Sequence, residues 1–171
     1  MGNRFVTLNF DARISAKAPT CSIGGYVSHP SFGHRWFRQS FRHSDFVSLG
    51  IDVQAEMQRE ISCYEALAQA ALILAASSLL PCCNIPIRLK SLSDNSGAES
   101  GINKCWTTSR PLAYFLERIS LVAAVHRVSL DVSHIPGEEN KKADALSHPE
   151  EYALPLDCLP HERLAVDLQS L

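Results

Sequence analysis

Residues 134–148 read HIPGEENKKADALSH and follow VSLDVSHI, a run in which apolar and polar side chains alternate. Such alternation is typical of a strand. Asn140 can cap a short helix over KKADALSH, because an asparagine side chain at this position accepts a hydrogen bond from a free backbone N–H. Asp144 lies in the first turn of that helix, where the helix dipole favours an ionised acid. The segment therefore predicts a strand followed by a helix that carries a carboxylate near its start.

The preceding sequence alternates between strand and helix patterns. A run dominated by Ala and Leu, without Gly or Pro until Pro81, predicts the longest helix. Gly24 and Gly25 permit a bulge or a close backbone approach in the second strand. Strands are predicted over residues 5–12, 20–29, 34–41, 85–92 and 128–135, and helices over about 54–80, over 103–127 with a break near Pro111, and over 141–148. We predict an α/β fold with a mixed five-stranded sheet, in the chain order βββ-α-β-α-β-α, and helices packed on it.

The composition fits one intracellular domain. The chain has 171 residues, 46% of them hydrophobic, which is enough to bury a core. A net charge of -2 gives no global basic field, so a nucleic-acid partner would need a local basic patch or accompanying domains. Six cysteines without C-x-x-C spacing, and an N-terminus without a secretory pattern, predict reduced thiols in a cytoplasmic or nuclear protein. We expect a domain over residues 1–148 and a tail over 149–171 that is partly ordered at best.

One uncharged segment, ALAQAALILAASSLLPCC at residues 66–83, is long enough to be a membrane-spanning candidate. Gln69, two serines and Pro81 weaken its apolar character, and no Lys/Arg cluster flanks it. A buried core helix is the preferred interpretation, and we expect no membrane partner.

Four acids lie at the ends of predicted strands or near the starts of predicted helices: Asp11, Glu65, Asp94 and Asp144. Three of them have a plain alternative. Asp94 can begin a turn in SDNSG, Glu65 can reach solvent or an arginine, and Asp144 can be a helix-start charge. A buried ionised acid is nevertheless costly unless it is paired, protonated or bound to a metal. If the four converge, they form an oxygen-only cage that suits a hard cation such as Mg²⁺.

With this set of acids, the chain resembles the ribonuclease H domain, especially that of retroelement reverse transcriptases. The matching residues are Asp11 in FDARISA, Glu65 in YEALAQA, Asp94 in SDNSGAE and Asp144 in HIPGEENKKADALSH. The last segment is the most specific, because it follows the pattern H-x-x-G-x-x-N-x-x-A-D-x-L-S-[RK] up to its final position. The resemblance spans residues 4 to 148.

Three features depart from the family pattern. Arg13 stands where the family has a small polar residue, and His148 stands where the final basic residue is expected. The stretch between Glu65 and Asp94 is also longer than is usual in the family.

The resemblance implies endonucleolytic hydrolysis of the RNA strand in an RNA–DNA hybrid by a two-metal mechanism, with Mg²⁺ as the cofactor and Mn²⁺ as a substitute. It implies that Asp11 bridges both ions, that Glu65 and Asp94 lie on the leaving-group side, and that Asp144 lies on the water side. It further assigns proton movement or product release to His134, for which a loop histidine bonded to backbone is the plain alternative. A reverse transcriptase domain of the same polyprotein is the implied partner.

Candidate substrate contacts lie in two places. Asn95 and Ser96 could reach the RNA 2′-hydroxyl groups, although a turn explains them equally well, and Asn140 is a helix cap before it is a substrate contact. In HRWFRQSFRH, Arg35 and Arg38 alternate with aromatic residues, together with Arg42, a combination that suits phosphates and bases. An edge strand with solvated arginines and core aromatics has the same pattern.

Other functions are open at this point. An integrase-like transferase fits poorly, because neither Glu117 nor Glu138 follows Asp94 at the spacing that such enzymes need. A catalytically silent ribonuclease H-like module, acting as a scaffold or nucleic-acid-binding domain, is the main alternative. A host ribonuclease H and a decayed copy of a retroelement domain are also compatible with the sequence.

Overall fold

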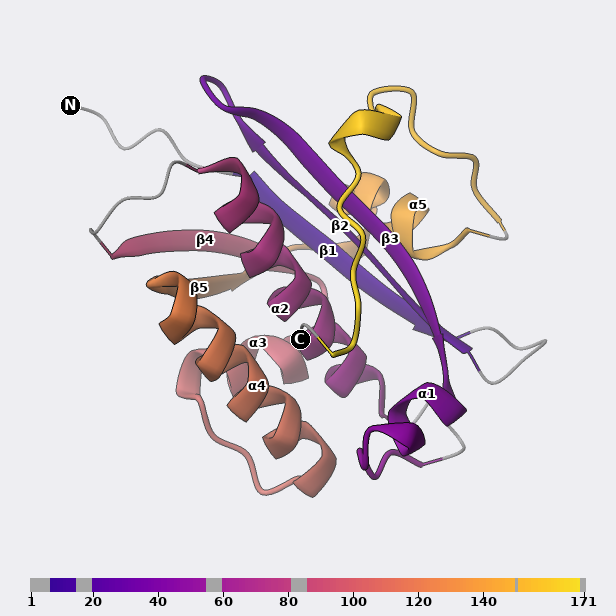
Figure 1. Ribbon diagram of the computed structural model, residues 1–171, viewed down its shortest axis with the longest axis vertical. Coiled ribbons are helices and arrows are strands. Elements are labelled where there is room, and N and C mark those ends of the chain that lie inside the picture. Colours follow the sequence, from indigo (N-terminus) through magenta and orange to yellow (C-terminus); the bar gives the residue numbers. More distant parts are fainter. Residues whose placement is uncertain (1–6, 15–19, 55–59, 81–85, 150, 170–171) are drawn as a thin grey trace.

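The computed structural model describes the backbone of residues 7–14, and the residues 20–54, 60–80, 86–149 and 151–169. Figure 1 shows a twisted sheet at its centre, with α2 crossing in front of the strands and α5 behind them. This layered arrangement confirms the α/β class that was predicted from the strand and helix patterns.

The strands form two groups that share one sheet. The first group is an antiparallel meander of β1 (Thr7–Ile14), β2 (Thr20–His29) and β3 (Gly33–Arg42). The second is a parallel pair of β4 (Ile87–Ser93) and β5 (Val128–His134). Two parallel residue pairs, Leu8 with Ser91 and Asn9 with Leu92, join β1 to β4. The resulting strand order is β3-β2-β1-β4-β5.

The helices are α1 (His43–Ser48), α2 (Ile61–Leu79), α3 (Ser96–Lys104), α4 (Arg110–His126) and α5 (Lys141–Ser147). Short 3₁₀ turns cover η2 (Gly137–Glu139) and η3 (Pro160–Glu162). The first long helix thus begins later than the sequence predicted, although part of that stretch, residues 55–59, lies outside the described residues.

The region after β4 differs most from the prediction. A helix, α3, begins at Ser96, where the sequence indicated a turn, because Asn95 Oδ1 accepts a hydrogen bond from Ala98 N at 2.8 Å. Pro111 does not break a helix but stands in the first turn of α4, where its missing N–H is not needed.

The two faces of the sheet are covered differently. On one face, α2 is buried nearly all round between the sheet and α4, and an aromatic cluster of Phe46, Tyr64 and Phe115 packs beside it, with ring centroids 5.5 to 6.4 Å apart. The helix is long and apolar enough to cross a membrane, and 72% of its most apolar 18-residue window is buried inside the fold. A core helix that is hydrophobic all round has the same composition.

On the other face, α5 packs unusually close to β2. A Cβ atom added to Gly24 would lie 2.4 Å from the carbonyl carbon of Leu146 and 2.4 Å from the backbone nitrogen of Ser147. Only glycine leaves room for this contact, which confirms the close backbone approach predicted for this strand.

The described part of the tail, residues 151–169, contacts β3, and its trace passes over this strand (Figure 1). Trp36 Nε1 donates to Leu159 O at 2.8 Å, and Leu164 N donates to Trp36 O at 2.8 Å. Its Val166 and Leu168 are buried in the main core. β3 is an edge strand with unpaired backbone groups, and the tail satisfies some of them. The three prolines and the weak periodicity of residues 149–171 gave no sign of this pairing in the sequence.

Candidate active site

Two parallel strands bring Asp94 and His134 to the same edge of the sheet. Ser93, the last residue of β4, pairs with His134, the last residue of β5, and Ile135 N donates to Ser93 O at 2.9 Å. Asp94 follows directly and is half-buried, whereas His134 is exposed. The strand pairing therefore fixes a carboxylate next to an imidazole.

The surroundings of Asp94 include a second acid. Burial raises the pKa of the Asp94 carboxyl above its usual value, and the negative charge of Asp144 raises it further. Hydrogen bonds from its own backbone and from the Asn140 side chain lower this pKa in part, as does His134. Asp144, Asn140 and His134 thus all lie close enough to Asp94 to influence the charge state of its carboxyl.

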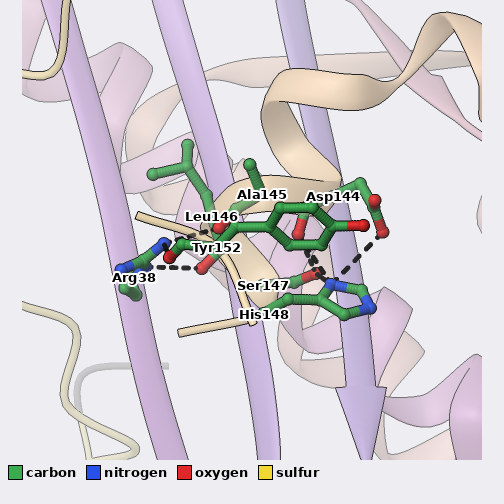
Figure 2. Close-up of polar contacts among 7 residues, drawn as sticks. All are labelled: Arg38, Asp144, Ala145, Leu146, Ser147, His148 and Tyr152. Atoms are coloured by element: carbon green, nitrogen blue, oxygen red, sulfur yellow. Dashed lines mark hydrogen bonds and ion pairs between the residues drawn. The ribbon is translucent and has the colours of Figure 1, made fainter. Parts of the chain in front are cut away.

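Asp144 is held by the residue that ends the motif. His148 Nδ1 lies 3.2 Å from Asp144 Oδ1, 2.6 Å from Asp144 O and 2.8 Å from Ser147 Oγ (Figure 2). The imidazole is nearly buried, with 11% of its side chain exposed, while 40% of the Asp144 side chain is exposed. With a proton on Nδ1, His148 donates toward the Asp144 carboxylate and carbonyl. The departure from the family pattern at position 148 therefore puts an imidazole behind the acid.

Glu65 lies on α2 with 2% of its surface exposed. Two polar bridges flank it on the helix. Ser62 Oγ donates to Asn95 Oδ1 at 3.4 Å, and Ser91 Oγ donates to Gln69 Oε1 at 2.9 Å. Residues three before and four after Glu65 share its helix face. The bridges therefore turn the Glu65 face of α2 toward β4 and the residue that follows Asp94.

Asp11 is described only by its place in β1, because the side chains of this strand lie outside the described part of the structure. In the sheet register it pairs with Gly24. Since α5 packs on Gly24, the backbone of Asp11 runs next to the helix that carries Asp144.

A cation would suit this site. Among the side chains that the structure describes, no group of three His, Cys, Asp or Glu residues is close enough to hold a metal ion. The negative charge of Asp144 nevertheless disfavours ionisation of Asp94, and carboxylate oxygens are the ligands that hard cations prefer. This donor chemistry fits a divalent cation.

No family model matches the sequence, and the curated proteins contain no match to it. Solved structures do match. Ribonuclease H1 from the halophilic archaeon Halobacterium salinarum is 16% identical with a TM-score of 0.60, over 84% of this chain and 94% of that one. The N-terminal ribonuclease H domain of Rv2228c from Mycobacterium tuberculosis, solved as a fusion with maltose-binding protein, is 13% identical with a TM-score of 0.62, over 86% and 93%. LC11-RNase H1 in complex with an RNA/DNA hybrid is 12% identical with a TM-score of 0.57, over 84% and 94%.

The chain has a ribonuclease H-like fold. At these identities the likeness extends to the fold and not to individual residues. The predicted α/β architecture thus matches that of solved ribonuclease H1 domains.

The candidate substrate residues near the acids mainly make contacts within the protein. Asn95 caps α3 and also accepts from Ser62, while Ser96 is exposed as the first residue of α3. Asn140 stands at the N-cap position of α5, but its side chain makes no cap hydrogen bond and instead bonds Asp94. The predicted cap at Asn140 is therefore wrong: its backbone, at φ -90° and ψ 18°, lacks the extended conformation that a capping residue typically has.

The arginines of β3 do not form one patch. Arg38 Nε donates to Leu146 O at 2.9 Å and its Nη2 donates to Ala145 O, so the guanidinium caps the end of α5 (Figure 2). Arg35 Nη1 donates to His34 O at 2.9 Å and lies on the opposite face of the strand from Arg38. Arg42 is exposed at the start of α1. Arg38 has a structural role here, and the predicted basic strip is split between two faces.

The sequence did not reveal the bridges that hold α2 against β4. Gln69 was the one signal, since it is a polar residue within an apolar helix and is fully buried. Its partner, Ser91, is also fully buried. A buried amide in such a helix requires a polar partner, and this requirement could have indicated the bridge.

Proposed function

We propose that the protein is a metal-dependent endonuclease that hydrolyses the RNA strand of RNA–DNA hybrids. One arrangement supports this most: Asp94 shares its surroundings with Asp144, Asn140 and His134 on a ribonuclease H-like fold. A similar structure, LC11-RNase H1, was solved in complex with an RNA/DNA hybrid, which favours a hybrid as the substrate.

Asp11, Glu65, Asp94 and Asp144 would hold two Mg²⁺ ions, with Mn²⁺ as a substitute. When bound, such ions activate a water molecule and stabilise the leaving oxygen of a phosphodiester. Burial and the charge of Asp144 disfavour the ionised form of Asp94, so a bound cation would favour ionisation of this carboxyl.

The remaining steps use other side chains of this chain. Asn140 and the backbone of residue 94 orient the Asp94 carboxylate by hydrogen bonds, and His148 does so for Asp144. The water oxygen forms a bond to phosphorus while the bond to the 3′-oxygen breaks, which yields a 5′-phosphate and a 3′-hydroxyl. His134 is exposed beside Asp94 and can deliver the proton that the leaving oxygen needs.

The biological context that we propose is a retroelement. The segment from His134 to His148 resembles the last motif of retroelement ribonuclease H domains. A reverse transcriptase domain of the same polyprotein is then the partner, in the cytoplasm or nucleus.

The alternative is a silent module that binds nucleic acid or a reverse transcriptase without cutting. The absence of a three-residue metal group among the described side chains favours it. All four acids are present in the sequence, however, and loss of such ligands is the usual mark of silent domains.

Cleavage of a labelled hybrid separates the two functions. The purified chain is incubated with an RNA–DNA hybrid labelled on its RNA strand, in Mg²⁺, Mn²⁺ or EDTA, beside duplex DNA of the same sequence. We expect cutting of the RNA strand with either metal and none in EDTA or on duplex DNA. Hybrid binding without cutting at any metal concentration would instead support the silent module.

A further inference from the structure

A second cluster of polar side chains lies on α5 away from the acids. Lys142 Nζ is 3.4 Å from His34 Nε2 of β3 and 4.3 Å from the ring centroid of Tyr26 of β2. The carboxylate of Asp157, from the tail, lies 2.6 Å from the same ammonium. We call Lys142, His34 and Tyr26 the lysine cluster. Three elements of the fold therefore converge on one cation, and the tail supplies its anion.

The lysine cluster has one charged group, the ammonium of Lys142, and Asp157 is its counter-ion. Burial, followed by the charge of Lys142, lowers the pKa of His34, so the imidazole is disposed to stay neutral and accept from the ammonium. The hydrogen bond from Lys142 to Asp157 lowers the pKa of Asp157, which keeps this carboxylate ionised. One positive charge thus meets one negative charge, and the negative one belongs to a side chain that is 67% exposed.

We propose that the lysine cluster is a subsite for a backbone phosphate of nucleic acid, and that Asp157 competes with the phosphate for Lys142. This inference rests on the proposed function, because it assumes a nucleic-acid substrate. A carboxylate oxygen at 2.6 Å occupies the place that a phosphate oxygen would take against an ammonium. Because exposed ion pairs are worth only about 0–1 kcal/mol, a phosphate can displace the carboxylate without unfolding the tail.

The position of Lys142 suits a residue that binds the substrate rather than one that takes part in the reaction. Lys142 precedes Asp144 by two residues, so their side chains project about 200° apart around α5. A phosphate on Lys142 would therefore belong to a different nucleotide from the one at the acids. Arg38, on the neighbouring strand, is not an equivalent candidate, because it bonds to the carbonyls that end α5.

Binding measured without cleavage tests this subsite. Fluorescence anisotropy in EDTA gives the affinity of the full chain for a labelled RNA–DNA hybrid and for duplex DNA of the same sequence. The variants are Asp157→Asn, Lys142→Gln and the two combined. Asp167→Asn is the matched control, since Asp167 is another exposed tail acid before a buried residue and accepts a hydrogen bond from Gln169 N.

We expect Asp157→Asn to bind either nucleic acid about two- to fivefold more tightly than Asp167→Asn does. We also expect its salt dependence to steepen by about one phosphate contact. Lys142→Gln should weaken binding and remove the gain from Asp157→Asn in the double variant. Equal affinities for the two asparagine variants, or a gain that survives Lys142→Gln, would overturn the subsite.

The outcome is separate from that of the proposed function. A phosphate subsite reads neither base nor sugar, so the gain should appear on duplex DNA even if the chain cuts nothing. Cleavage of hybrids with unchanged binding in all variants would overturn the subsite alone.

Discussion

Replacing Gly24 by alanine should damage both the fold and the proposed activity. The new Cβ would lie 2.4 Å from two backbone atoms of α5, whereas ordinary contact begins at 3.4 Å, so α5 must retreat by about 1.0 Å (3.4 minus 2.4). No side-chain rotation relieves this overlap, because the nearest atoms belong to the backbone of Leu146 and Ser147. β2 is fixed between β1 and β3, and the displacement therefore falls on the helix that carries Asp144.

The magnitudes follow from the type of overlap. Overpacking of this kind costs about 1–3 kcal/mol. For a protein of this size, that lowers the melting temperature by about 2–12 °C. A misplacement of about 1 Å in a catalytic constellation can reduce the rate on the order of 100-fold. Thermal melting by circular dichroism and cleavage of the labelled hybrid measure the two effects.

The matched control for this change is Gly101→Ala in α3. There the nearest atoms are side-chain atoms of Leu112 and Leu116 at 3.5 Å and beyond, which is ordinary contact. Alanine also favours a helix over glycine by about 1 kcal/mol, so this variant should melt at or above the wild type. Wild-type melting and cleavage by Gly24→Ala would refute the idea that α5 depends on this close approach.

Further substitutions test the site and the bridge between α2 and β4. Asp11→Asn and Asp94→Asn should each reduce hybrid cleavage to background with an unchanged fold, since an amide lacks the anionic oxygen that a hard cation needs; a near-wild-type rate at saturating Mg²⁺ would make that acid structural. In EDTA, Asp94→Asn should melt at a higher temperature than the wild type at neutral pH and lose this advantage in acid. The pKa of Asp94 is raised in the folded state, so the wild type is stabilised at low pH and loses that stability as the pH rises through this pKa. Equal differences in melting temperature at both pH values would contradict this. His134→Ala should slow cleavage without removing it, and an unchanged pH profile would leave His134 a plain loop residue. Gln69→Leu should destabilise the fold by about 1–3 kcal/mol by leaving Ser91 without its acceptor, and adding Ser91→Ala should restore part of the loss; purely additive losses would show that the two are not coupled.

The sheet was predictable because its strands follow simple patterns. The second strand was predicted at residues 20–29 and is observed there, and the others begin or end within two residues of their predicted limits. α3 was missed because Ser96, Gly97, Ser100 and Gly101 are poor helix formers. Its start depends on one capping bond from Asn95, which composition does not reveal.

The sequence patterns placed Asp94 after the fourth strand and His134 at the end of the fifth, and the parallel pairing of these strands brings the two residues to one edge of the sheet. The residues that support the acids were harder to predict. The partner of Asn140 could not be predicted, because a cap and a carboxylate contact call for the same residue type. The role of Arg38 depends on which face of the sheet α5 covers, and the alternation of side chains along β3 does not predict which face that is.

Basic side chains around α5 are bonded within the protein, and this affects how an isolated domain would bind a hybrid. Arg38 bonds carbonyls and Lys142 bonds Asp157, so neither is available to a phosphate without a competing contact. Lys141 is exposed and lies three residues before Asp144 on the same side of α5, which leaves it better placed for the substrate. With a net charge of -2, such contacts are few, and affinity rises mainly with the number of phosphates neutralised. A tethered basic domain, such as the proposed reverse transcriptase, would raise the affinity for the hybrid by increasing its effective concentration near the site, without new contacts within this fold.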